Sequence, residues 1–144
     1  MEKIREKIKN AWYKDGLRFE CNQCGICCRG DGPGAVWVSE EEINAIAAYL
    51  RIYVEIFKKR FVRQILNRFS LVERSNYDCV MYENGCSIYE VRPYQCRTFP
   101  FWLANIDTSE EWDRLKSHCP GVGKGKLYSR NEIKEIICKN NLTA

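Results

Sequence analysis

Four cysteines stand within eight residues, in the run Cys21-Asn22-Gln23-Cys24-Gly25-Ile26-Cys27-Cys28. Two residues separate Cys21 from Cys24 and Cys24 from Cys27, a spacing that lets one loop direct three sulfurs into a small volume. The bacterial ferredoxin motif opens with the same spacing, and its remote fourth cysteine is followed by proline, as Cys119 is here. Clustering this dense rarely serves packing alone, so the run predicts metal ligands rather than buried or disulfide-bonded thiols.

Cys28 needs a separate explanation because the side chains of adjacent residues point in different directions. Two adjacent cysteines seldom share one mononuclear ion, so Cys28 either serves a second centre, which we favour, or packs as a small apolar residue. For each of the later cysteines taken singly, a buried thiol is the alternative to a ligand. The predicted grouping is Cys21, Cys24, Cys27 and Cys119 for one centre and Cys28, Cys79, Cys86 and Cys96 for the other.

The type of metal is constrained less strongly than its ligands. Structural zinc sites are commonly built from two close cysteine pairs, whereas this chain has one compact cluster and widely spread remaining cysteines. Iron–sulfur clusters also take four thiolates. We expect an iron–sulfur cluster of the [4Fe-4S] type, with zinc as the alternative. Arg92 and Arg97 flank Cys96 and either place positive charge near an anionic centre or lie as solvated surface arginines.

Charge and hydropathy exclude two classes of partner. The formal net charge is +4, which alone would suggest nucleic acid, but eight bound thiolates and two divalent centres would bring it close to zero. No stretch approaches the roughly 18 apolar residues of a membrane span, and the first residues are charged where a signal peptide is apolar. We therefore expect a cytoplasmic protein that binds neither nucleic acid nor membrane.

Two capping boxes mark the best-defined helices. Ser39 with Glu42 precedes one apolar helical face, and Ser129 with Glu132 precedes a C-terminal helix. The apolar face of the C-terminal helix includes Cys138. Weaker helical spacing predicts further helices over residues 2–13 and 54–61, with periodicity that continues to Ile65.

The dipeptide Asn84-Gly85 predicts a β-hairpin, because both central positions of the favoured tight turn need positive φ. Its arms would be residues 79–82 and 86–89, each with one cysteine. Residues 35–38 are expected to form a short strand, and residues 98–102 an extended, partly buried segment. We predict a single α+β domain over residues 1–144, helix-rich with a short β-hairpin and organised around cysteine-ligated metal.

These motifs together resemble the YkgJ-like cysteine-cluster (CxxCxxCC) family of zinc- or iron-chelating proteins. The resemblance covers residues 19–126 and rests on the cysteine run, on Cys86-Ser87-Ile88-Tyr89 leading to Arg92-Pro93, on Cys96-Arg97-Thr98-Phe99-Pro100-Phe101, and on Cys119-Pro120-Gly121. It implies that Cys138 lies outside the family pattern. It also implies a set of eight metal ligands, namely Cys21, Cys24, Cys27, Cys28, Cys79, Cys86, Cys96 and Cys119.

Three functions fit a chain of this kind. The first, which we favour, is an iron–sulfur protein with a redox or electron-transfer role and a protein redox partner. The second is a structural zinc module that binds another protein, and the third is a metal-handling protein. No nucleophile motif or phosphate-binding loop is found, so the sequence assigns no catalytic residue.

Overall fold

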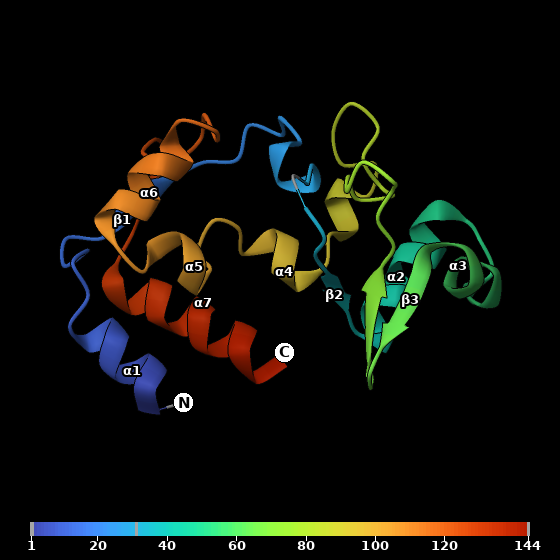
Figure 1. Ribbon diagram of the computed structural model, residues 1–144, viewed down its shortest axis with the longest axis horizontal. Coiled ribbons are helices and arrows are strands. Elements are labelled where there is room, and N and C mark those ends of the chain that lie inside the picture. The colour runs from blue at the N-terminus through green and yellow to red at the C-terminus, as the bar shows by residue number, and fades with distance from the viewer. Residues whose placement is uncertain (1, 31, 144) are drawn as a thin grey trace. The chain divides into compact units, whose positions relative to one another are not determined.

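The computed structural model describes residues 2–30 and 32–143, without the side chains of Ile26 and residues 141–143. It divides the chain into two compact units (Figure 1). Unit 1 consists of Met1–Asn22 and Thr98–Ala144, and unit 2 consists of Gln23–Arg97. Helices and small antiparallel sheets together confirm the predicted α+β class.

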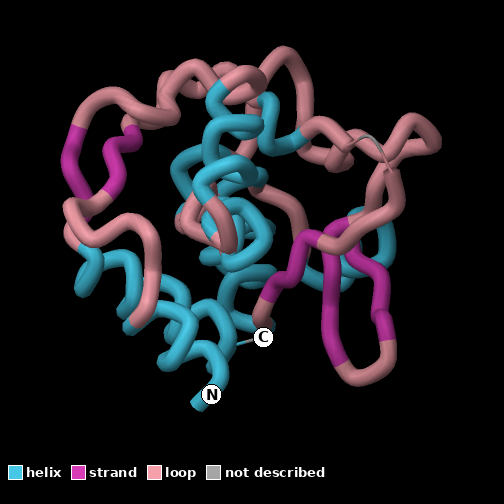
Figure 2. Tube along the Cα trace, turned by 60° about the vertical axis from the view of Figure 1, so that its left-hand side comes forward, coloured by secondary structure: helices cyan, strands magenta, loops and turns pink. Residues whose placement is uncertain are grey.

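Unit 2 is built on one antiparallel sheet and two longer helices. Its sheet has the strand order β2-β4-β3, and these strands lie side by side in Figure 2. Val36 pairs with Leu71 across β2 and β4, and Val62 pairs with the same Leu71 across β3 and β4. The elements of unit 2 are η1 (Ile26–Cys28), β2 (Val36–Val38), α2 (Glu40–Leu50), α3 (Val54–Phe61), β3 (Val62–Ile65), β4 (Arg68–Leu71), η2 (Tyr89–Val91) and α4 (Tyr94–Arg97).

Helix α2 begins where its capping box predicts. The Ser39 hydroxyl accepts from the Glu42 amide at 3.1 Å, and the Glu42 carboxylate accepts from the Ser39 amide at 3.0 Å. These two bonds satisfy donors that the first helical turn would otherwise leave unpaired. The helix ends at Arg51, whose left-handed conformation (φ 57°) lets its backbone amide donate to the carbonyls of Ala47 and Ala48 in the last turn.

The β-hairpin of unit 2 lies elsewhere than the sequence predicts. Helix α3 ends at Phe61, and the apolar residues that continue the helical spacing to Ile65 lie in strand β3. The chain then turns at Leu66 (φ 57°) and pairs back on itself as strand β4. Asn84-Gly85 does form a tight turn with positive φ at both residues. Its arms are not strands, because pairing there stops at the single bridge between Tyr82 and Cys86.

Unit 2 has a hydrophobic core of its own. Both helices and the sheet supply fully buried side chains, and the segment that carries the later cysteines contributes as well. The buried members are Cys28, Val38, Ile43, Ile46, Ala47, Phe57, Leu71, Cys79, Met81 and Ile88. Two cysteines therefore lie at the edge of an apolar core.

In unit 1, the N-terminal segment of the chain packs against and pairs with the C-terminal segment. Helices α1 and α7 lie side by side (Figure 1), and β1 pairs antiparallel with β5. The capping box of α7 forms as predicted, since the Ser129 hydroxyl accepts from the Glu132 amide at 3.1 Å and the Glu132 carboxylate accepts from the Ser129 amide at 3.3 Å. The elements are α1 (Glu2–Lys9), β1 (Leu17–Phe19), α5 (Leu103–Ile106), α6 (Ser109–Lys116), β5 (Lys126–Tyr128) and α7 (Arg130–Thr143).

Two expectations for unit 1 are corrected. Helix α1 ends at Lys9, well before residue 13. Residues 98–102 are not extended, because the Phe101 amide donates to the Thr98 carbonyl at 2.8 Å and closes a turn. Phe101 is nonetheless buried, and Cys138 packs against the same core from α7. None of the described helices is long and apolar enough to cross a membrane.

We predict that Glu42→Ala destabilises unit 2 by about 1–2 kcal/mol, because it removes the capping bond to Ser39 and a second bond to the Tyr94 amide. Glu41→Ala, an exposed position in the same helical turn, is the matched control and should change stability by less than about 0.5 kcal/mol. Urea unfolding followed by circular dichroism measures both. Equal effects would show that neither bond contributes to stability.

Candidate metal centre

The cysteine run turns sharply at Gly25 before its last two cysteines. Gly25 has φ +79°, and a β-carbon there would stand 2.8 Å from the Tyr82 ring and 2.9 Å from the Gly85 α-carbon. The Cys28 amide donates to the Gly25 carbonyl at 2.9 Å and closes the 3-10 turn η1. The run therefore lies directly against the turn that precedes Cys86, and only glycine fits at this contact.

A backbone hydrogen bond ties the run to Cys79. The Cys79 amide donates to the Cys28 carbonyl at 2.7 Å. The neighbouring Asp78 carboxylate, buried in unit 2, accepts from the Gly30 amide at 3.4 Å and from the Asn76 side-chain amide at 3.2 Å. These contacts hold the segment that follows Cys28 against the segment that precedes Cys79.

Cys86 is held by the turn on which it lies. The Glu83 amide donates to the Gly85 carbonyl at 2.8 Å. Just beyond Cys86, Ser87 donates to the Met81 carbonyl through its amide at 2.9 Å and its hydroxyl at 2.7 Å. This turn places Cys86 beside the cysteine run.

Cys96 lies in the short helix α4, which two side chains attach to the rest of unit 2. Gln95 accepts from the Trp37 amide at 2.9 Å and donates to the Ala35 carbonyl at 3.0 Å, so it joins α4 to β2. Glu42 accepts from the Tyr94 amide and joins α4 to the start of α2. A helix this short has little stability alone, so these contacts fix the position of Cys96.

Three sulfurs of unit 2 interact directly, namely those of Cys27, Cys28 and Cys86. Hydrogen bonding from the Cys28 thiol is the main cause that lowers the pKa of Cys27 to about 7, and it does the same for Cys86. The pKa of Cys28 itself is raised, because its proton is shared with both neighbours. Burial is the main cause that raises the pKa of Cys79 and of Cys96, and the negative charges of nearby cysteines raise both further.

Arg92 supplies the positive charge of this cluster. Its guanidinium lies 3.8 Å from the centre of the Tyr89 ring, and its Nε donates to the Tyr89 carbonyl at 2.9 Å. From this position it lowers the pKa values of Cys27, Cys86 and Cys96. The structure thus supports the charge-donating role for Arg92, whereas Arg97 is exposed and lies 5.5 Å from the Tyr94 ring centre.

The structure gathers five of the eight expected ligands in one neighbourhood. The predicted grouping of Cys28 with Cys79, Cys86 and Cys96 stays a prediction, and within it the sulfurs of Cys28 and Cys86 are in contact. Cys27, however, was expected in the other group, and its sulfur interacts with Cys28 and Cys86 instead. Adjacent side chains diverge in general, but the Cys28 thiol reaches back to Cys27 and forward to Cys86.

The remaining expected ligands are Cys21, Cys24 and Cys119. Cys21 and Cys119 belong to unit 1, on neighbouring segments, because the Glu20 amide donates to the Gly121 carbonyl at 3.1 Å. Cys119 is buried and Cys21 is exposed. Cys24 belongs to unit 2 and is exposed.

The sulfurs of unit 2 form a chain of contacts rather than a closed ring. Within residues 2–30 and 32–143, no three His, Cys, Asp or Glu side chains surround a common position as ligands surround an ion. The donor set nevertheless suits a thiophilic metal, because thiolates are the ligands that zinc and iron prefer in four-coordinate sites.

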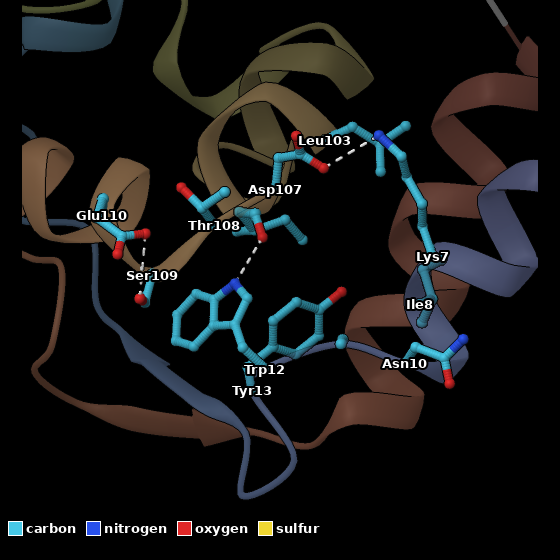
Figure 3. Close-up of a pocket in the computed structure, with 12 residues that line it drawn as sticks. Lys7, Ile8, Asn10, Trp12, Tyr13, Leu103, Asp107, Thr108, Ser109 and Glu110 are labelled. Atoms are coloured by element: carbon cyan, nitrogen blue, oxygen red, sulfur yellow. Dashed lines mark hydrogen bonds and ion pairs between the residues drawn. The ribbon is translucent and has the colours of Figure 1, made fainter.

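Unit 1 contains a cavity of about 360 Å³ between α1, the loop after it and the α5–α6 segment (Figure 3). The Trp12 indole donates to the Ile106 carbonyl at 2.9 Å, and Lys7 pairs with Asp107 at 3.1 Å. No cysteine is among the described residues that line it. This cavity is therefore not part of the thiol cluster.

Comparison with known proteins agrees with the thiol cluster. A family model described as "CxxCxxCC: Putative zinc- or iron-chelating domain" matches residues 20–120. The uncharacterized protein MJ0661 of Methanocaldococcus jannaschii is 32% identical over 99 residues, which cover 67% of this chain and 52% of that protein. The uncharacterized protein MJ0939 of the same organism is 25% identical over 143 residues, which cover 85% of this chain and 44% of that protein.

The chain thus spans about half the length of the curated relatives that it matches. No solved structure matches it.

Several residues that position the cysteines were not identified from the sequence as part of the site. Asp78, Gln95 and Glu42 act through partners 48, 58 and 52 residues away. Glu42 carries a local signal, but that signal indicates a helix cap and not a link to α4. No local pattern distinguishes Asp78 or Gln95 from ordinary surface residues.

We predict that Gly25→Ala destabilises metal-free unit 2 by about 2 kcal/mol or more, because a β-carbon would be strained at this φ and would collide with Tyr82 and Gly85. Gly34→Ala is the matched control, since a β-carbon there meets nothing within 4 Å, and should change stability by less than about 0.5 kcal/mol. Guanidinium unfolding compares them. A neutral Gly25→Ala would mean that the run does not pack against the 82–85 turn.

Proposed function

This chain belongs to the CxxCxxCC family of zinc- or iron-chelating domains, and we propose that it is a metal-handling protein whose unit 2 binds one ion through cysteine thiolates. The observation that carries the proposal is that the thiols of Cys27, Cys28 and Cys86 are in contact, and that Cys79, Cys96 and Arg92 lie near enough to interact with them electrostatically. Four of these thiolates suffice for a tetrahedral ion. We assign the resident ligands as Cys28, Cys79, Cys86 and Cys96.

Contact between the sulfurs supports a single ion over a cluster. Metal–sulfur bonds of about 2.3 Å in a tetrahedral site separate the sulfurs by about 3.8 Å, which is close to the separation in a thiol–thiol hydrogen bond. The Cys28 thiol makes such bonds to Cys27 and Cys86. In a four-iron cluster each cysteine binds a different iron, so the ligand sulfurs stand further apart. Zinc or a single iron ion fits this spacing.

An iron–sulfur cluster with a redox role is the second candidate. It is supported by the spacing of Cys21, Cys24 and Cys27, which is that of a cluster-binding loop. In that case the Arg92 charge would favour the reduced, more negative state.

The core of unit 2 supports metal handling over a purely structural role. Small structural zinc domains lack a sufficient core and unfold without the ion. Unit 2 buries Ile43, Ile46 and Phe57 fully, and none of these side chains is a metal ligand. The exposure of Cys27, together with the half-buried positions of Cys86 and Cys96, leaves the thiol cluster accessible on one side. Such a site can exchange its ion without unfolding.

A bound ion would supply positive charge that neutralises the thiolates, while the protein would hold the ligands in position and favour their thiolate form. The Cys79–Cys28 backbone bond and the contacts of Gln95 and Glu42 hold the ligand backbone in place. Arg92 lowers the free energy of several thiolates before an ion arrives. Since protonated thiols must lose their protons, binding is expected to release protons to solvent.

The first test is metal analysis of protein made with ample iron and zinc under anaerobic conditions. We expect stoichiometric zinc or iron without acid-labile sulfide, and we expect Cys96→Ser to lose one ion per chain while Cys138→Ser loses none. Cys138 is the matched control because it packs on the unit 1 core, outside the thiol cluster. Equimolar iron and sulfide would favour the second candidate, and an equal loss in both variants would contradict the assigned ligands.

The second test separates metal handling from a structural role. After removal of the ion by a chelator, we expect the helical circular dichroism to persist and unfolding in urea to remain cooperative, because the unit 2 core consists mainly of apolar side chains that bind no metal. The midpoint should fall, since an ion that binds only the folded state stabilises it. Loss of cooperative unfolding on chelation would indicate a structural site instead.

A further inference from the structure

The thiol cluster of Cys27, Cys28, Cys79, Cys86 and Cys96 has one more thiol than a four-coordinate ion needs, and its five thiols differ in exposure. Cys28 and Cys79 have exposed fractions of 8% and 9%, and Cys86 and Cys96 are half-buried. Cys27 is exposed to solvent. The extra thiol is therefore the one that an external molecule can reach most easily.

The backbone separates the roles of the two adjacent cysteines. The Cys28 carbonyl accepts from the Cys79 amide, and its side chain belongs to the unit 2 core. Its thiol contacts Cys27 on one side and Cys86 on the other. Cys28 thus connects the exposed thiol to the buried part of the set. Two adjacent cysteines seldom bind one mononuclear ion at the same time, so Cys28, whose side chain belongs to the core, is assigned as the resident ligand.

We infer that Cys27 is an exchange ligand, which receives a thiophilic ion from an external thiolate donor and passes it to Cys28, Cys79, Cys86 and Cys96. The inference rests on the proposed function and extends it to the route by which the ion enters and leaves. The donor or acceptor is a molecule that carries metal on thiolates, since such a ligand matches the chemistry of the ion's resting site.

Each step exchanges one metal–sulfur bond for another. A bond from the ion to the Cys27 sulfur forms as one bond to the donor sulfur breaks, and the proton that leaves the Cys27 thiol is available to the departing donor thiolate. Each bond from the ion to a resident sulfur then replaces one of the remaining donor bonds, and the resident thiol gives its proton to the departing donor thiolate or to solvent. The last resident bond replaces the bond to Cys27, whose thiolate takes up a proton again. The oxidation state of the metal does not change, so no oxidant or reductant is required. Release to an acceptor reverses these steps.

The exposure of Cys27 gives the external molecule a point of attack without opening the core. A donor that had to reach Cys28 or Cys79 directly would have to displace the apolar side chains around them. The contact of Cys27 with Cys28 means that the ion needs to move only from one sulfur to its neighbour. Exchange of this kind keeps the ion bound to thiolate throughout.

The experiment compares Cys27→Ser with Cys28→Ser in the full chain loaded with zinc, and Cys138→Ser serves as the matched control. Bound zinc per chain is measured first, by elemental analysis after gel filtration. Zinc transfer to a chromogenic chelator and zinc uptake from a zinc–thiolate complex are then timed by stopped flow. Circular dichroism establishes that each variant is folded, and Cys27→Ala repeats the test with a substituent that cannot bind metal.

We expect Cys27→Ser and Cys27→Ala to retain the zinc content of the unaltered chain but to exchange it on the order of tenfold more slowly. Cys28→Ser should lose one ion per chain, and Cys138→Ser should match the unaltered chain in both measurements. If Cys27→Ser loses an ion, Cys27 is a resident ligand and the inference is wrong. If it exchanges zinc at the original rate, Cys27 is not on the exchange route. If the unaltered chain binds no zinc or iron, the proposed function itself fails.

Discussion

The hydrogen bond of 2.7 Å from the Cys79 amide to the Cys28 carbonyl joins two segments that are far apart in the sequence. It brings the end of the cysteine run to the beginning of the segment that carries the later thiols. The buried Asp78 carboxylate reinforces this junction through the Gly30 amide, and Gly25 allows the run to pack against the 82–85 turn. Without this junction the thiols of unit 2 would belong to separate loops, and neither shared protons nor a shared ion would be possible.

Local signals predicted those parts of the fold that local interactions determine. The capping boxes at Ser39 and Ser129 start α2 and α7 because their hydrogen bonds span only three residues. The β3–β4 hairpin was missed because Leu66 adopts positive φ at a turn that lacks glycine, so no turn signal separates it from the preceding helix. At Asn84-Gly85 the turn forms as predicted, but the arms pack on other parts of unit 2 instead of continuing as strands.

The sequence identified the cysteines as expected metal ligands. Their grouping, however, depends on contacts between distant segments, which the spacing of the cysteines does not reveal. The grouping of Cys28 with Cys79, Cys86 and Cys96 stays a prediction, whereas Cys27, which was expected with Cys21, Cys24 and Cys119, has a sulfur that contacts the Cys28 thiol. Side chains of adjacent residues leave the backbone in different directions. The Cys27 and Cys28 side chains nevertheless meet, because their sulfurs share a hydrogen bond. Gln95 and Glu42 hold Cys96 in place through partners more than fifty residues away, which no single-sequence pattern reveals. The proposed division between resident and exchange ligands follows from this packing and from exposure.

X-ray absorption spectroscopy at the metal edge tests the central claim most directly. The sample is a full-length variant in which Cys21, Cys24 and Cys119 are serine, so that five cysteines of the proposed ligand neighbourhood remain in unit 2 together with Cys138 in unit 1. A single ion held by Cys28, Cys79, Cys86 and Cys96 predicts four sulfur neighbours at about 2.3 Å and no second metal nearby. A short iron–iron distance, or a first shell dominated by oxygen and nitrogen, would contradict it.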